Sequence, residues 1–378
     1  MITLAEAGKL GAVHSARPGV LSLYLTVPRN PADLRGLPAG ADDLITAAEN
    51  AVGSPGRAAA GDREAVREEL QLSGRDWLGR TVAVFACASA GLFEAFPLPG
   101  PLPNQAVLGI RPHIRPLLAV LHRYPAYHAA VVDRQHARLF RIAGDEMETV
   151  TAPAAPGVRD TRFGGWYGLE TYRVQQRVAQ FARLHYRDTA ALLEKAMGVS
   201  EEEPLVIGGH GEGIPQLLAS LPPAARERFA GSFAADVHTL TPARVRELAA
   251  PLAARWATQR AEHLAGQVLD MPPGRLAAAG LEACLAAVNA RAAEILIVPG
   301  NGLIPGRRCG QCGTLTVAHR RCPECGAVTL PVPDLIEEMV ARTLENDGQV
   351  YPVHNRPSPL AARLRFPLAR WPASPLAR

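Results

Sequence analysis

Lysine is almost missing from this 378-residue chain: Lys9 and Lys195 are the only two among 40 basic residues. With 36 acidic residues the net charge is a mild +4. The arginine bias, together with 34 glycines and 33 prolines, is typical of a GC-rich coding sequence. The number of arginines therefore says little about nucleic-acid binding. Their positions still carry information, because a guanidinium can grip phosphate through two parallel hydrogen bonds.

Long hydrophobic runs are also missing, and the N-terminus shows no charged-then-apolar signal. Cysteine is scarce, with six residues in all, and a disulfide-rich secreted scaffold is thereby excluded. Cys87 and Cys284 lie in apolar runs and are expected to be small buried residues. These features predict a soluble cytoplasmic protein that does not bind membranes.

The other four cysteines form two Cys-x-x-Cys-Gly knuckles: Cys309 and Cys312, then Cys322 and Cys325. Two disulfides or a redox dithiol are the alternatives, but two knuckles this close together favour four thiolates around one zinc ion. Sulfur-only ligation leaves no open position, so the site is expected to be structural. The sequence predicts a zinc ribbon over residues 307–327.

Turn signals and hydrophobic patterns divide the chain into three α/β domains. Expected domains are an N-terminal α/β domain over residues 1–125, a middle domain over residues 126–268 and a C-terminal α/β sandwich over residues 269–378 that contains the ribbon. A mixed sheet flanked by helices is expected in the middle domain. The strands are expected at residues 81–88, 91–97, 294–299 and 349–354, and the helices at residues 41–72, 170–197, 276–293 and 334–346.

A glycine-rich loop, Gly164-Gly165-Trp166, stands at the mouth of the long helix expected at residues 170–197. Arginines crowd into and after this loop. Such side chains can follow a phosphate backbone, and Trp166 can stack on a base. The alternatives are a solvated helix face and a tryptophan buried against its own domain. The candidate RNA-binding residues are Arg159, Arg162, Arg173, Arg177 and Arg187.

Two other patterns give less information about function. The glycine cluster at residues 208–213 lacks the Lys-Ser/Thr of a P-loop and the spacing of a dinucleotide fingerprint, so a tight strand-to-helix turn is expected. His136 is expected in a hairpin turn. No Ser/His/Asp set stands out, and the lack of acidic clusters for Mg²⁺ argues against a nuclease.

Several short segments occur in an order that resembles the bacterial members of the archaeo-eukaryotic class-1 peptide release factor superfamily, which includes the Pelota-type rescue factors. The segments are Val20–Leu25, Gly91–Glu94, Val131–Phe140, Gly164–Trp166, Val174–Arg177, Gly280–Ala283, Ile295–Val298, the zinc ribbon and Leu360–Phe366. The resemblance implies a divergent N-terminal domain, a ribonuclease-H-like middle domain and a C-terminal domain like kink-turn-binding proteins. It further implies ribosome, ribosomal RNA and P-site tRNA as partners, with a translational GTPase as a further one, and no DNA.

The family releases the nascent chain from peptidyl-tRNA with a Gly-Gly-Gln loop, by positioning and electrostatic stabilisation. Here Gly164 and Gly165 match the loop tip, but Trp166 stands in place of the glutamine. Three hypotheses follow. The protein is a ribosomal A-site factor acting in peptidyl-tRNA release, rescue or quality control; or a non-hydrolytic, hibernation-type A-site occupant; or a general RNA-binding module. In the first, Gly164, Gly165 and Trp166 are the candidate catalytic residues.

Overall fold

The computed structural model describes residues 2–15, 19–52, 60–150, 168–198, 203–271, 276–300, 302–353 and 360–368. The chain divides into two compact units, each described by itself below. Unit 1 combines residues 1–122 with residues 260–378, and unit 2 holds residues 123–259. No helix in the described ranges is long and apolar enough to cross a membrane.

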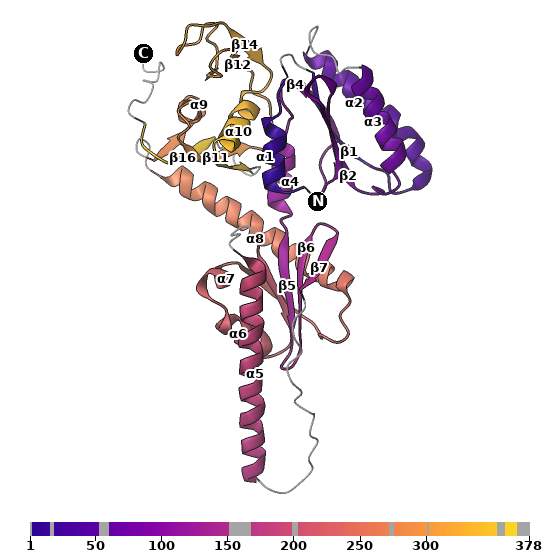
Figure 1. The fold of residues 1–378 in the computed structure, drawn as a ribbon, viewed down its shortest axis with the longest axis vertical. Coiled ribbons are helices and arrows are strands. Elements are labelled where there is room, and N and C mark those ends of the chain that lie inside the picture. Colours follow the sequence, from indigo (N-terminus) through magenta and orange to yellow (C-terminus); the bar gives the residue numbers. More distant parts are fainter. Residues whose placement is uncertain are drawn as a thin grey trace. The chain divides into compact units, whose positions relative to one another are not determined.

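Unit 2 is built on a five-stranded mixed sheet of order β7-β6-β5-β8-β9. β5, β6 and β7 form antiparallel hairpins, whereas β8 and β9 run parallel to β5 (Figure 1). The carboxyl ends of β5, β8 and β9 therefore meet at one edge. The strands are β5 (Tyr127–Val132), β6 (Ala137–Ala143), β7 (Glu146–Val150), β8 (Leu205–Gly209) and β9 (Phe229–Ala234).

Helices cover both faces of this sheet, because alternate residues of the buried strand β5 point to opposite sides. Ala130 and Val132 pack against Tyr186 of α5, whereas Ala129 and Val131 pack with Val245 of α8. The connection from β5 to β8 thus crosses one face, as parallel strands require. The helices are α5 (Gly168–Met197), α6 (Gly213–Ser220), α7 (Pro223–Glu227) and α8 (Pro242–Asp270), which continues into unit 1.

The N-terminal part of unit 1 holds an antiparallel sheet of order β3-β2-β1-β4. Apolar residues at every second position, such as Leu21, Leu23 and Val84, pack against two helices, α2 and α3, that lie on one face (Figure 1). The elements are α1 (Leu4–Ala12), β1 (Val20–Thr26), α2 (Leu37–Val52), α3 (Ala60–Ser73), β2 (Thr81–Cys87), β3 (Leu92–Pro97), β4 (Gln105–Gly109) and α4 (Arg115–Arg123), with 3-10 turns at Pro31–Gly36 and Ala88–Ala90.

The C-terminal part of unit 1 has a second sheet, of order β10-β16-β11-β15. Ile295 and Ile297 of β11 pack against the end of α8 through Ala265 and Val268. A three-stranded ribbon of order β13-β12-β14 follows β11. The elements are β10 (Ala277–Ala279), α9 (Leu281–Asn289), β11 (Ala293–Pro299), β12 (Gly306–Cys309), β13 (Leu315–Thr316), β14 (Thr329–Val332), α10 (Leu335–Glu345), β15 (Gln349–Val353) and β16 (Ala361–Leu364).

The α/β class predicted from the sequence is confirmed, and so are the strands predicted at residues 81–88, 91–97, 294–299 and 349–354. Two helix predictions need correction. The helix expected over residues 41–72 is two helices, α2 and α3. The helix expected from residue 276 begins only at Leu281, because residues 277–279 form β10 and pair with β16.

Candidate functional site

The two cysteine knuckles of the ribbon have the same backbone geometry. In the first, the N–H of Gly313 donates to Cys309 O at 3.1 Å, and in the second, the N–H of Gly326 donates to Cys322 O at 2.9 Å. Both glycines adopt a left-handed conformation, with φ of 75° and 74°. A side chain would strain the backbone there, so glycine is what allows each knuckle to close.

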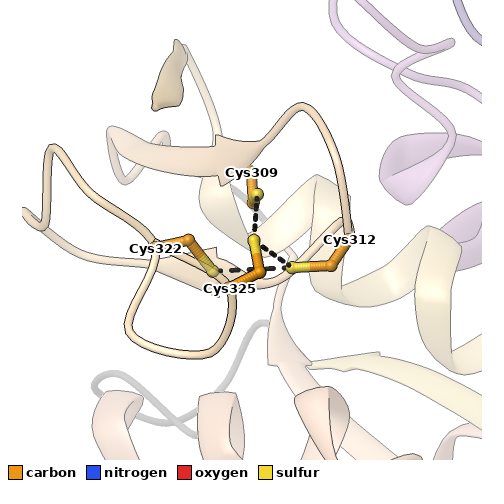
Figure 2. Close-up of side chains that lie close together, drawn as sticks. All are labelled: Cys309, Cys312, Cys322 and Cys325. Carbon is orange, nitrogen blue, oxygen red and sulfur yellow. Dashed lines mark hydrogen bonds between the residues drawn. The ribbon is translucent and has the colours of Figure 1, made fainter. Parts of the chain in front are cut away.

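These turns bring four sulfur atoms together, as Figure 2 shows for Cys309, Cys312, Cys322 and Cys325. All four lie within 4.8 Å of one another, and three of the sulfur–sulfur distances are 3.4–3.5 Å. A zinc ion with Zn–S bonds of about 2.3 Å has tetrahedron edges of about 3.8 Å. The cluster can hold a metal ion, and its four thiolates are a donor set that suits zinc.

The disulfide alternative disagrees with this geometry, since sulfur atoms 3.4 Å apart are well beyond a bond of about 2.05 Å. The pKa values of the cysteines also favour a metal site over disulfides. Hydrogen bonds from the Thr314 hydroxyl and backbone lower the pKa of Cys312 to about 6. The Ala327 N–H lowers the pKa of Cys325, but neighbouring sulfurs outweigh it and raise that pKa to about 12. Four thiolates this close need a cation to coexist.

The ribbon is fixed to the rest of unit 1 beside the first knuckle. The amide of Asn289 in α9 exchanges two hydrogen bonds with the backbone of Leu315, at 2.8 and 2.9 Å. Arg342 of α10 donates to Gly313 O at 2.7 Å. These contacts hold the knuckle with Cys312 in place against α9 and α10.

A polar pocket of about 360 Å³ opens at this junction. Burial and the neighbouring guanidinium of Arg291 lower the pKa of Arg342, which shows that positive charge is crowded here. A zinc ion with four thiolates would carry two negative charges, which these arginines could compensate. The pocket is lined by Arg111, Arg291, Arg308, Cys312, Gly313, Leu315, Glu338, Arg342, Glu345 and Asn346.

The second predicted site, the glycine-rich loop, falls outside the described residues. This applies to Gly164, Gly165 and Trp166, and to Arg159 and Arg162. The backbone of α5 includes Arg173 and Arg177, but their side chains are outside the described part as well. Arg187 lies on α5 and is exposed.

The described half of α5 is amphipathic. Tyr186, Ala190 and Leu193 are buried in the core of unit 2, while Arg183 and Arg187 on the same helix are exposed. The spacing of the buried residues is that of one helical face. An arginine-bearing face of α5 is thus open to solvent, as both the RNA-binding and the solvated-face interpretations require.

Sequence reasoning missed a buried ionic cluster in unit 1. Arg115 at the start of α4 is 1% exposed and forms an ion pair with Asp334, the N-cap of α10. His113 Nδ1 lies 2.9 Å from Glu337 Oε2. Burial raises the pKa of Glu337, but His113, Arg115 and the backbone N–H of Ile114 together outweigh it and lower that pKa. The three basic residues Arg111, His113 and Arg115 were the signal, although the sequence could not identify their partners.

The middle of the chain is similar to a known protein family. The model of bacterial archaeo-eukaryotic release factor family 10 matches residues 112–295, just under half of the chain. This match confirms the resemblance drawn from the sequence, and the matched region contains the glycine-rich loop and α5. No curated protein matches the chain.

Solved structures also align with most of the chain. They include ribosome-bound archaeal Pelota with ABCE1 (15% identity, 77% of this chain and 78% of that chain, TM-score 0.41) and the archaeal termination factor aRF1 (16%, 95% of each, TM-score 0.24). A third is Dom34 of S. cerevisiae, a translation termination-like factor that interacts with Hbs1 (10%, 79% and 83%, TM-score 0.40). With TM-scores this low, function rests on the family match and on this chain's own residues.

Proposed function

Because residues 112–295 match the bacterial archaeo-eukaryotic release factors, we propose that this protein binds the ribosomal A site and acts on stalled or terminating ribosomes. The family match carries the proposal, since it spans the loop and helix that such factors use. The proposal includes a division into three domains at residues 125 and 268. It also includes a translational GTPase as a partner and a cytoplasmic location.

The glycine-rich loop is the proposed contact with peptidyl-tRNA. Gly164 and Gly165 let the backbone approach a crowded target closely, and the amide N–H groups of Gly165 and Trp166 would face the ester. Their role would be to position water and to stabilise negative charge in the transition state. The side chain of a glutamine is not required for that part of the chemistry.

Arginines on α5 are the proposed contacts with ribosomal RNA. Support comes from the exposure of Arg183 and Arg187 on the face opposite the helix core. Guanidinium groups along a helix can follow a phosphate backbone without reading its sequence. Arg159, Arg162, Arg173 and Arg177 would extend this surface toward the loop.

A second candidate function is favoured by one observation: Trp166 occupies the place of the loop glutamine. The nearest glutamines, Gln175 and Gln176, lie inside α5, and at ~1.5 Å per residue they are more than two turns from the tip. In this second function the protein occupies the A site without hydrolysis and protects idle ribosomes. Trp166 would then stack against ribosomal RNA.

One experiment separates these functions. Purified protein is mixed with ribosomes that carry labelled peptidyl-tRNA in the P site and an empty A site, and released peptide is measured beside ribosome-bound protein. Release that Gly165→Pro abolishes and Gly168→Ala preserves supports a hydrolytic factor. Binding with no release supports the protective occupant, and the absence of both contradicts the proposal in favour of a general RNA-binding module.

A further inference from the structure

A second group of side chains that could hold a metal ion lies in unit 2, away from the cysteines. It forms where the parallel strands β5, β8 and β9 end at the same edge of the sheet. Asp133 follows β5 directly, and His238 stands four residues after the end of β9. His136 closes the hairpin from β5 to β6. The carboxyl edge of parallel strands is a common place for ligand sites in α/β sheets.

The Asp133 carboxylate is held in one orientation by its own turn. Its Oδ1 accepts backbone N–H groups from Gln135 at 2.7 Å and from His136 at 2.6 Å. The Asp133 N–H donates to His136 O at 3.0 Å and closes the hairpin. Burial raises the pKa of Asp133, but these hydrogen bonds outweigh it and lower that pKa. The hydrogen bonds to Oδ1 therefore fix the orientation of the carboxylate, and Oδ2 faces the two histidines.

The loop that carries His238 is also held in place by hydrogen bonds. The N–H of His238 donates to Asp236 Oδ1 at 2.9 Å, and the N–H of Leu240 donates to Asp236 O at 3.1 Å. Arg138 of β6 donates to the backbone oxygens of Val237 and Leu240, on either side of His238. The imidazole of His238 thus projects from a turn that is fixed to the sheet.

The distances between donor atoms fit ligands that share an ion. His136 Nδ1 lies 3.5 Å and His238 Nε2 lies 3.4 Å from Asp133 Oδ2. Tetrahedral zinc with bonds of about 2.0–2.1 Å to nitrogen and oxygen has edges of about 3.3–3.5 Å. A charge-assisted N–H···O hydrogen bond is shorter, about 2.7–2.9 Å. His136 Nδ1 is also buried and has no hydrogen-bond partner among the described residues.

We propose that Asp133, His136 and His238 bind a divalent transition-metal ion, with zinc as the best match, in a site separate from the four cysteines. The donor set of two imidazoles and one carboxylate suits zinc and its neighbours rather than Mg²⁺ or Ca²⁺. Three protein ligands leave the fourth position to water or another small ligand. The three donor atoms lie within 4.8 Å of one another before any ion binds.

Charges around the site are balanced well enough to accept a cation. Arg134 and Glu212 form a loose exposed pair at 3.9 Å, so they add little net charge. Burial and the charge of Asp133 raise the pKa of Tyr186 on α5. Arg138 is turned to backbone oxygens. One carboxylate and two imidazoles would hold the ion.

Cobalt titration of the full-length, zinc-loaded protein tests the proposal. Zinc in the cysteine site leaves only the second site for Co²⁺, and Co²⁺ bound by nitrogen and oxygen lacks the strong sulfur charge-transfer absorption of a cysteine site. We expect one equivalent to bind without that band, and binding to weaken at least tenfold in Asp133→Asn and in His238→Ala. His210→Ala is the matched control, because His210 is an exposed histidine just after β8.

The control should bind Co²⁺ within twofold of the wild type, and circular dichroism should show all variants folded. No binding of a second equivalent would overturn the proposal. An equal loss in His210→Ala would overturn it as well, because it would show general attraction of cobalt to surface histidines. A sulfur charge-transfer band that accounted for all of the bound cobalt would mean that cobalt had entered the cysteine site alone, and would overturn the proposal.

Discussion

At the scale of single residues, buried charges in this protein are held by partners that come from distant parts of the sequence. Glu203, next to β8, accepts hydrogen bonds from Arg141 of β6 and lies 2.9 Å from His128 Nε2 of β5. Burial raises the pKa of Glu203, but these partners outweigh it and lower that pKa to about 2. The ionised carboxylate therefore stabilises unit 2.

Glu203→Gln should lower the free energy of unfolding at pH 7 by roughly 2–3 kcal/mol, since a tenfold change in an acid dissociation constant corresponds to about 1.4 kcal/mol. A lowered pKa in the folded state contributes stability above the unfolded pKa near 4.5, and that stability is lost as pH falls toward 2. Urea unfolding of both proteins between pH 7 and pH 3 measures this. A difference that stays constant with pH would contradict the ionic role.

Arg115 is the second residue that we expect to matter strongly. It is 1% exposed, and besides its pair with Asp334 it donates to Pro299 O at 3.1 Å and to Gly302 O at 2.7 Å. Arg115→Met removes the cation and leaves Asp334 charged and buried, which should destabilise unit 1 by about 3–5 kcal/mol. Thermal and denaturant unfolding measure the effect.

Arg63→Met is the matched control for Arg115. Arg63 on α3 also forms ion pairs, with Asp42 and Glu49, but its side chain is 21% exposed. Loss of a partly solvated pair should change stability by about 1 kcal/mol or less. Equal losses of stability in the two variants would show that burial does not increase the contribution of the Arg115 ion pair.

The four-cysteine cluster could be predicted from the sequence because its members lie close together in the chain. Cys309 and Cys325 are 16 residues apart, and the knuckle spacing is itself the signal. By contrast, Arg115 and Asp334 are 219 residues apart, and Asp133 and His238 meet only because β5 and β9 lie in one sheet. No periodicity or spacing in a single sequence reveals such pairs.

At the scale of elements, helices with clear end signals were predicted well. α10 begins after Asp334, whose carboxylate accepts the N–H of Ile336 at 3.1 Å, and ends before Asn346. These are the capping residues that the sequence displays. The helix boundary therefore follows from local chemistry alone.

The region around Gly280 shows where local propensity misleads. Alanines favour a helix from residue 276, but residues 277–279 pair with β16 as β10. Gly280, with φ of 84°, turns the chain before α9 begins at Leu281. A partner strand more than 80 residues away overrides the helical preference, and the sequence alone could not supply that contact.

Left-handed glycines in the ribbon give a prediction at this scale. Gly326 has φ of 74° and open space where a Cβ would stand, so Gly326→Ala tests backbone strain alone. It should destabilise the metal-bound ribbon by about 1–2 kcal/mol and weaken zinc binding by a similar free energy. A zinc competition assay with a chromophoric chelator measures it.

The control for Gly326 lies in the same ribbon. At Gly310 an added Cβ would meet only Leu330 Cδ1, at an ordinary 3.9 Å. Gly310→Ala should therefore leave zinc affinity within about twofold of the wild type, well under 1 kcal/mol. If Gly310→Ala weakened binding as much as Gly326→Ala, the conformation of the knuckle would not be the cause.

At the scale of the whole molecule, the four-cysteine cluster lies in unit 1. Loss of its metal ion should therefore unfold only part of that unit. The ribbon strands β12, β13 and β14 form their own sheet, while the core of unit 2 is separate. Removal of zinc by a chelator should unfold the ribbon and leave unit 2 folded, because metal binding is coupled to local folding. Hydrogen exchange with and without chelator measures this, and loss of protection throughout unit 2 would contradict it.

The overall class and the similarity to bacterial archaeo-eukaryotic release factors could be predicted because segments spread over the whole chain keep one order. The packing of residues 1–122 with residues 260–378 in one compact unit could not, because it depends on pairs such as Arg115 with Asp334. The sequence predicts three domains, whereas the structure divides into two compact units. Only contacts between the first and last parts of the chain make this visible.

The most direct test of the central claim is binding to ribosomes in competition with an A-site tRNA, measured by co-sedimentation over a range of salt concentrations. We expect A-site tRNA to displace the protein, and Arg173→Ala/Arg177→Ala to weaken binding and flatten its salt dependence by about two ionic contacts. Arg244→Ala, an exposed arginine at the start of α8, should leave both unchanged. Binding that A-site tRNA does not reduce, or an unchanged salt slope in the double variant, would contradict the account.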